Sequence, residues 1–143
     1  MNTVSNLPPS CDIERYSILS LCAKRCPDGT VPKIEIRPDV KVSDGNCKYS
    51  VRLECNRIDS GFTFSCLIEA DFVFHEPISP KNVMHAWVNG CTILYGILRN
   101  IYSVNALQCV HKELMLPAVM MVDVVKNTID EIKSKNLPSR QIH

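Results

Sequence analysis

The chain has 143 residues, of which 45% are hydrophobic and 22% are charged, and its formal net charge is +1. This length provides for one hydrophobic core but not for two, so we expect a single folded domain. The near-neutral charge, together with an aromatic content of 6%, disfavours nucleic acid and anionic membranes as partners.

The first ten residues, Met1–Ser10, are polar and contain no basic stretch followed by an apolar core. We therefore expect residues 1–10 to be disordered and the protein to have no secretory signal. No run in the chain approaches the roughly 18–20 apolar residues that cross a bilayer. These features predict a cytoplasmic protein that is not inserted in a membrane.

Eight cysteines are spread along the chain, at Cys11, Cys22, Cys26, Cys47, Cys55, Cys66, Cys91 and Cys109. A zinc site would need two closely spaced pairs of Cys or His, and only Cys22 with Cys26 forms one. We therefore expect no metal. Cys55, Cys66 and Cys91 lie on apolar registers and are predicted to be small core residues, as in a protein of the reducing cytoplasm.

The first part of the chain has the pattern of long strands. Cys11–Cys26 predicts one strand with a bulge, which ends at the turn Pro27–Gly29. Lys33–Val42 alternates between apolar and polar residues but contains Pro38, which cannot donate to a ladder. This segment is therefore either an edge strand or a crossing loop that feeds a strand, and Ser43–Asn46 is the next turn.

Two stronger strands follow, joined by a hairpin signal at Asp59–Gly61. The first places Tyr49, Val51, Leu53 and Cys55 on one face, and the second alternates over thirteen residues from Phe62 to Phe74. A period of two with one polar face predicts an antiparallel sheet that is covered on a single side.

The period then changes to that of a helix, with Ser79 as its cap, Pro80 at its first position and an end at about Leu107. Its apolar residues cover nearly the whole circumference. One subunit cannot shelter such a helix, so we expect self-association. The predicted oligomer interface consists of Trp87, Leu94, Ile97, Leu98 and Ile101.

A last helix is predicted from about Ala118 to Lys135. Val122, Val125, Ile129 and Ile132 form one apolar stripe along it. The remaining residues, 137–143, are expected to form a flexible tail, so that the folded domain spans residues 11–136.

The residues that carry chemistry do not form a catalytic constellation. The geometry allows a nucleophilic pair of Cys66 with His75 or of Cys109 with His111. Neither pair has an evident third group to orient it. Glu69 and Asp71 share a strand face that reads as the solvated one. With no phosphate-binding loop either, the sequence predicts a protein that is not an enzyme and has no cofactor.

Three segments resemble the SecB protein-export chaperones. Ile36–Val42 resembles the segment that follows the family's first strand, Ile93–Asn100 resembles part of its long helix, and Glu113–Val119 resembles the segment after that helix. The order of the elements also agrees over about Asp12–Lys133. The chain is therefore similar to a divergent SecB-like protein, in the manner of the SecB-like chaperones associated with toxin–antitoxin systems.

This resemblance implies an α+β fold with a four-stranded antiparallel sheet, a long helix and a C-terminal helix, assembled as a homotetramer that is a dimer of dimers. It also implies apolar grooves that hold unfolded or partly folded polypeptides. The residues that correspond to the groove are Ile36, Val40, Val42, Val125 and Ile129.

Export chaperones of this family dock the SecA motor through acids on the first strand. Here Ser17–Arg25 has no acid and ends in Lys24 and Arg25, so a basic partner would be repelled and SecA docking is disfavoured. The leading hypothesis is a chaperone that holds non-native polypeptides, for protein export or for a dedicated client such as an antitoxin. The alternatives are an adaptor or sequestering protein that binds a folded partner or a small ligand, and a thiol enzyme.

Overall fold

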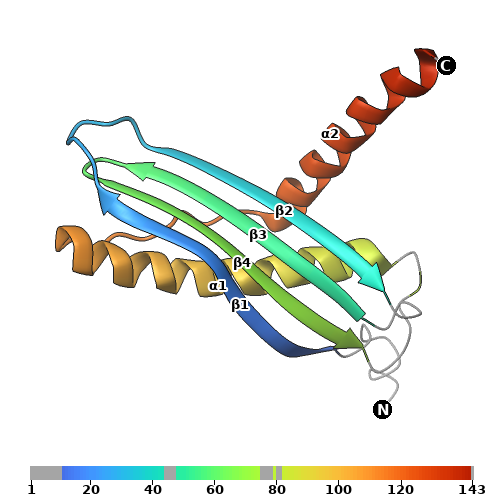
Figure 1. Ribbon diagram of the computed structural model, residues 1–143, viewed down its shortest axis with the longest axis horizontal. Coiled ribbons are helices and arrows are strands. Elements are labelled where there is room, and N and C mark those ends of the chain that lie inside the picture. The colour runs from blue at the N-terminus through green and yellow to red at the C-terminus, as the bar shows by residue number, and fades with distance from the viewer. Residues whose placement is uncertain (1–10, 44–47, 75–78, 80–81, 143) are drawn as a thin grey trace.

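The computed structural model describes residues 11–43, 48–74, 79 and 82–142 (Figure 1). Four strands precede two helices, which is the α+β class that the sequence predicts. The elements are β1 (Cys11–Arg25), β2 (Lys33–Ser43), β3 (Lys48–Asp59), β4 (Phe62–Phe74), α1 (Val83–Val110) and α2 (Met121–Ile142).

The four strands form one antiparallel sheet in the order β1-β4-β3-β2. The predicted hairpin joins β3 to β4, with Asp59 opposite Phe62. Gly61 in its turn has φ +83°, a conformation that other residues rarely adopt. Because β1 and β2 stand at the two ends of the strand order, they are the edge strands of the described sheet.

The strand β1 is bulged, as the sequence predicts. Its register against β4 shifts between Ile13 and Arg15 and again between Ile18 and Ser20. Each shift inserts one extra residue and keeps the apolar side chains on the inner face. As a result Ile18 lies opposite Ile68, which is itself buried.

The segment with Pro38 is an edge strand and not a crossing loop. It pairs with β3 without a register shift from Lys33 to Ser43, and Pro38 lies opposite Leu53. An edge tolerates proline because the missing N–H can face away from the neighbouring strand.

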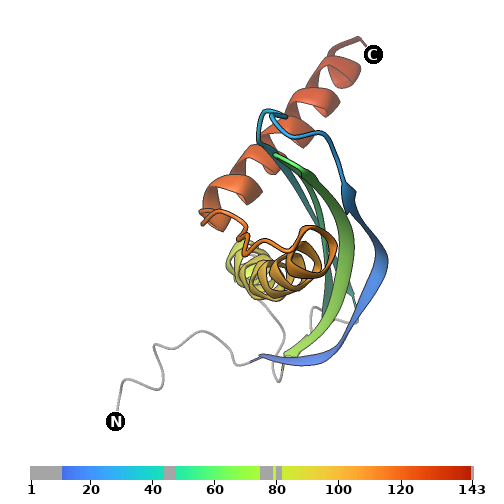
Figure 2. The same cartoon turned by 90° about the vertical axis from the view of Figure 1, so that its left-hand side faces the viewer.

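The core lies between the sheet and α1, on the concave side toward which the sheet curves (Figure 2). The inward residues of β4, and those of β3 from Tyr49 to Cys55, are buried in strict alternation. Cys55, Cys66 and Cys91 are fully buried among them, which confirms their prediction as core residues.

The predicted boundaries of both helices differ from those in the structure. The first helix begins at Val83 with Asn82 as its N-cap, and the amide of Asn82 donates to the carbonyl of Ser79 at 2.9 Å. Ser79 is thus bonded to the N-cap residue and is not itself the N-cap. The predicted first helical residue, Pro80, lies outside the described residues.

The second helix starts later and ends later than predicted. It runs from Met121 to Ile142, through the segment expected to be a tail. The predicted disordered residues 1–10, most of the turn at residues 43–46, and His75 and His143 lie outside the described residues.

The glycines of α1 provide a test of its packing against the sheet. A Cβ on Gly90 would lie 2.8 Å from Cγ2 of Val51 and 3.3 Å from a ring carbon of Phe72, whereas a Cβ on Gly96 would meet nothing within 4 Å. We expect Gly90→Ala to lower the free energy of unfolding by about 1–2 kcal/mol through overpacking. Gly96→Ala should raise it by up to about 1 kcal/mol.

Urea unfolding followed by circular dichroism measures both values. A Gly90→Ala protein that is as stable as Gly96→Ala would contradict the close approach of α1 to β3.

Candidate functional site

The segment between the two helices, residues 111–120, is fastened along α1. Tyr95 Oη donates a hydrogen bond of 2.6 Å to the carbonyl of Pro117, and Ser103 Oγ donates one of 2.8 Å to the carbonyl of Leu114. Leu116 between them is buried in the core. These contacts determine where the chain enters α2.

The first turns of α2 are held against the body of the domain, and its C-terminal half projects away from it (Figure 1). Met121 and Val125 are buried and anchor the helix in the core. This arrangement places the start of α2 beside the edge strand β2.

A groove of about 770 Å³ lies between β2 and α2. Its apolar lining comes from Ile34 and Ile36 on the strand, from Val119 in the segment before α2 and from Val124 in the first turn of α2. These aliphatic side chains are only partly buried. The rest of the lining is Glu35, Arg37, Pro38, Asn127, Thr128 and Glu131.

The charges at the groove are few and are placed at its rim. Arg37 Nη2 lies 2.7 Å from Glu35 Oε1, and both side chains are well exposed. Glu35 and Arg37 alternate along the strand with the inward residues Ile34 and Ile36. Both side chains therefore point away from the inner face. The groove thus has an apolar floor and a polar rim, as binding sites for extended or drug-sized ligands commonly have.

The structure brings only part of the predicted client-binding set to this groove. Ile36 lines it. Val40 and Val42 follow on the same face of β2 but are partly buried against the core beyond the groove. Val125 is fully buried and has an anchoring role, and Ile129 is partly buried against the core.

The groove residues of α2 were missed because they lie one position away from the predicted stripe. Val124, Thr128 and Glu131 follow each other at helical spacing beside Val125 and Ile129. The rotation of α2 about its axis decides which of the two adjacent rows faces β2. The spacing in the sequence does not specify that rotation.

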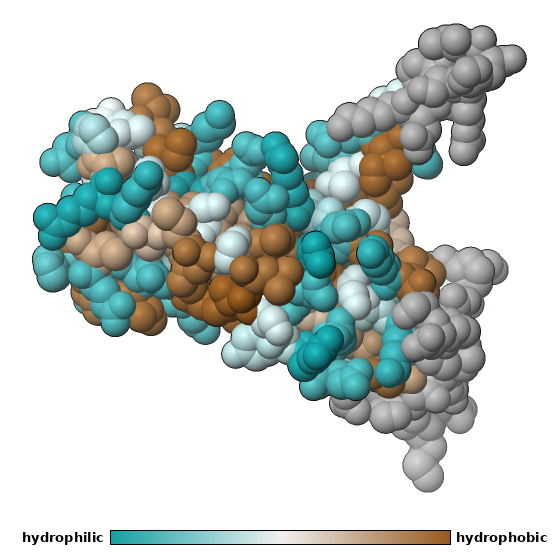
Figure 3. Space-filling view, viewed as in Figure 1, coloured by the Kyte–Doolittle hydropathy of each residue, from teal (hydrophilic) through white to brown (hydrophobic). Residues whose placement is uncertain are grey.

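A second apolar surface lies on the opposite flank of the domain. The inward row of β1, formed by Ile13, Tyr16, Ile18 and Leu21, keeps between 41% and 53% of its surface exposed. Ile93, Val104 and Leu107 of α1 are exposed as well. Figure 3 shows apolar surface gathered over the middle of β1 and the adjoining part of α1.

The predicted oligomer interface needs a correction. Trp87, Leu94 and Leu98 are buried against the chain's own sheet, so they have almost no surface left for a partner. Ile97 and Ile101 are partly buried on the side of the helix. The exposed apolar residues of α1 form a different row, which contains Ile93, Val104 and Leu107.

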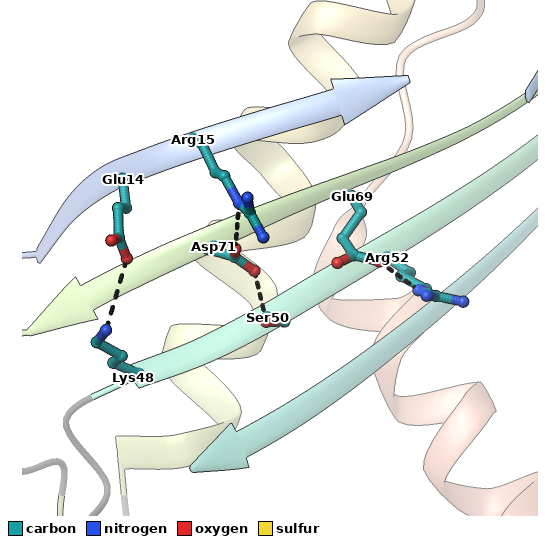
Figure 4. Close-up of polar contacts among 7 residues, drawn as sticks. All are labelled: Glu14, Arg15, Lys48, Ser50, Arg52, Glu69 and Asp71. Atoms are coloured by element: carbon teal, nitrogen blue, oxygen red, sulfur yellow. Dashed lines mark hydrogen bonds and ion pairs between the residues drawn. The ribbon is translucent and has the colours of Figure 1, made fainter. Parts of the chain in front are cut away.

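The outer face of the sheet is polar and its charges are paired (Figure 4). Asp71 accepts hydrogen bonds from Ser50 Oγ at 2.6 Å and from Arg15 Nε at 2.8 Å, and Arg52 Nε lies 2.5 Å from Glu69. The bond from Ser50, and after it the bond from Arg15, lower the pKa of the Asp71 carboxyl. Glu69 and Asp71 therefore lie on the solvated face, as the sequence predicts.

The buried thiols have no sign of activation. Burial raises the pKa of Cys55 and Cys91 to about 12 and that of Cys66 to about 11. Cys109 lies at the end of α1 with its Sγ 3.9 Å from the carbonyl of Ala23, and His111 is the C-cap of the same helix. Among the described residues, no group of three or more His, Cys, Asp or Glu is placed to hold a metal.

Thiol labelling tests this assignment. The reactive species is the thiolate, so thiols with a raised pKa stay protonated and unreactive at pH 7.5. We expect iodoacetamide to modify the exposed Cys22 in the folded protein, and Cys55, Cys66 and Cys91 only when the chain unfolds. Mass spectrometry of the labelled peptides measures this order, and rapid labelling of one buried thiol in the native protein would favour a thiol enzyme.

No protein-family model matches the chain, and no curated protein matches it. Two of the solved structures that are similar in fold are as follows. One is a SecB-like chaperone of Mycobacterium tuberculosis in complex with a ChAD peptide from the HigA1 antitoxin. The TM-score is 0.59 at 17% identity, over 76% of this chain and 90% of that one.

The other is a protein of unknown function from Streptococcus agalactiae, with a TM-score of 0.62 at 12% identity, over 78% of this chain and the whole of that one. The chain therefore has the SecB-like fold that the sequence resemblance implies. None of the helices within the described residues is long and apolar enough to span a bilayer.

Proposed function

We propose that the protein is a SecB-like chaperone that holds non-native polypeptides, and that the groove between β2 and α2 is its client-binding site. The observation that carries this proposal is an apolar groove beside an open strand edge. A groove of this kind binds through aliphatic contacts and backbone groups. It therefore accepts many sequences in an extended conformation.

The fold comparison supports this class of ligand. The similar chaperone of Mycobacterium tuberculosis is seen with a peptide from an antitoxin, so a dedicated antitoxin is one class of client that we propose for this chain. Protein export is the other. Because Asp71 and Glu69 are paired with Arg15 and Arg52 on the outer face, that face offers a SecA-like motor little net negative charge.

The proposal places the protein in the cytoplasm and gives it no catalytic role. The thiols with raised pKa values agree with this, since a nucleophilic cysteine needs a lowered pKa. Sequestration of a folded partner in the same groove is the alternative outcome of the test below.

A pair of substitutions on α2 tests the groove. Val124 lines it, whereas Ile132 is half exposed on the same helix outside its lining. We expect Val124→Asp to weaken binding of a reduced, carboxymethylated protein about tenfold or more, since loss of one buried aliphatic contact costs about 1.5 kcal/mol or more. Ile132→Asp should leave the affinity almost unchanged.

Suppression of the aggregation of a denatured client, at one oligomer per client, measures the activity directly. Both variants are first compared with the unsubstituted protein by thermal unfolding, so that loss of fold is recognised. In the opposite outcome, the unsubstituted protein holds no client while native mass spectrometry shows a stoichiometric folded partner. That result would contradict the chaperone and favour the sequestering protein.

We also propose that the protein works as a homotetramer, a dimer of dimers, and that the exposed rows of β1 and α1 form its interfaces. An apolar row this open to water is unusual in a monomer and typical of an interface. Ile97 and Ile101, which border the exposed residues of α1, belong to this proposed interface.

Light scattering on eluting protein tests the assembly. Ile18 and Val31 are both exposed aliphatic residues, but Val31 lies in the turn after β1 and is 79% exposed. We expect Ile18→Asp to reduce the measured mass to that of a smaller species, because it buries an unpaired carboxylate in the interface. Val31→Asp should keep the mass, and a compact monomer in the unsubstituted protein would contradict the assembly.

A further inference from the structure

The open edge of β2 presents its backbone groups in a fixed alternation. In an antiparallel ladder, residues alternately direct both backbone groups toward the neighbouring strand or away from it. Pro38 has no N–H and lies within an uninterrupted register, so it belongs to the set that faces away from β3. By the same alternation, the amides of Ile34, Ile36, Val40 and Val42 face the open edge.

This edge is divided at its centre. Pro38 offers no amide there, and the amide of Val40 already donates to Asp39 Oδ1 at 2.9 Å. Upstream, the described residues provide no hydrogen-bond acceptor for the outward amides of Ile34 and Ile36. These two residues line the groove, whereas Val40 lies outside its lining.

We propose that an extended peptide binds in the groove as a fifth strand, paired with β2 only along Lys33–Arg37, and that Pro38 and Asp39 end the pairing. This inference rests on the proposed function and specifies how the client is bound. The paired length is about five residues, or about 16 Å at the usual rise of a strand. Strand addition of this kind provides affinity through the backbone and leaves selection to alternate side chains.

The shape of the site favours a single extended chain as the occupant. The groove is closed on its far side by α2, with Val124, Thr128 and Glu131 opposite the strand. An added strand lies about 4.8 Å from its neighbour, and the groove of about 770 Å³ beside β2 is where it would lie. A second copy of β2 would bring its own α2 to the same place.

The side chains of the bound peptide would follow the faces of the sheet. Ile36 lies opposite Cys55, which is buried on the inner face, so an added strand directs every second side chain inward over the groove floor. The other side chains join the exposed outer face next to Glu35 and Arg37. The fitting segment is therefore aliphatic or aromatic at alternate positions and tolerates polar or charged residues between them.

Amide hydrogen exchange tests the pairing. The probe is reduced, carboxymethylated α-lactalbumin, a chain that cannot refold. On saturation we expect the exchange of the Ile34 and Ile36 amides to slow about tenfold or more, while the amides of Glu35 and Arg37 are already protected by β3. Val40 should not change.

Substitutions test the backbone contribution. Ile36→Pro removes an outward amide at a position equivalent to that of Pro38, and Ile36→Val keeps the amide with a similar side chain. We expect Ile36→Pro to bind the probe about tenfold more weakly than Ile36→Val. The double variant Pro38→Val, Asp39→Ala opens the central amides, and we expect probe binding to slow exchange at Val40 in it.

The outcomes separate this inference from the proposed function. Equal probe binding by Ile36→Pro and Ile36→Val, with aggregation of the client still suppressed, would overturn strand addition alone. Absence of probe binding in the unsubstituted protein would overturn both. If the Ile34 and Ile36 amides exchange more slowly at higher protein concentration in the absence of probe, the occupant is a second copy of the chain. That result would also overturn the inference.

Discussion

One helix is narrower than a sheet of four strands, and this difference determines which surfaces of the fold stay uncovered. An α-helix with its side chains is about 10–12 Å across. The outer strands of a four-stranded sheet lie about 14 Å apart, and their side chains extend the face further. Since α1 covers β3 and β4, it leaves a flank uncovered on each side. The two flanks are occupied differently, and both proposed surfaces follow from that difference.

On the β1 flank nothing in the described chain covers the inward row, so its apolar side chains stay exposed. On the β2 flank, the fastened linker brings α2 across the gap, which becomes a groove instead of an open face. Open edges are hazards that proteins usually restrict. Here β2 is restricted at its centre by Pro38 and the Asp39 side chain, while β1 has bulges.

The alternation of residues predicted the sheet well, because the period of two and the single polar face depend on local geometry alone. Tyr49 to Cys55 and Phe62 to Phe74 are buried as the pattern indicates. Helix boundaries were less well determined. Ser79 has the character of a cap, yet Asn82 occupies that position, and the carbonyl of Ser79 accepts a hydrogen bond from the Asn82 amide.

The candidate site was predicted only in part, for a reason that concerns tertiary structure. Ile36 was located through the resemblance of its segment to the SecB chaperones, but the role of Val125 depends on how α2 is rotated. That rotation is determined by the linker, through Leu116 in the core and the bond from Tyr95 to Pro117. Neither contact has a signature in the local sequence. The exposed row of α1 was misplaced for the same reason. Leu94 and Ile93 are both aliphatic, and only the rotation of the helix places Leu94 against the sheet and leaves Ile93 exposed.

The distribution of charge completes the argument for recognition by backbone and aliphatic groups. Several cations and anions on the outer face are paired within the sheet, as with Arg15 and Asp71, and the rim of the groove holds its own pair in Glu35 and Arg37. Paired surface charges steer a partner weakly, because their fields largely cancel. What remains for recognition on the inner side is apolar area and an open strand edge. Both are insensitive to sequence, which is the property that a protein holding many non-native chains requires.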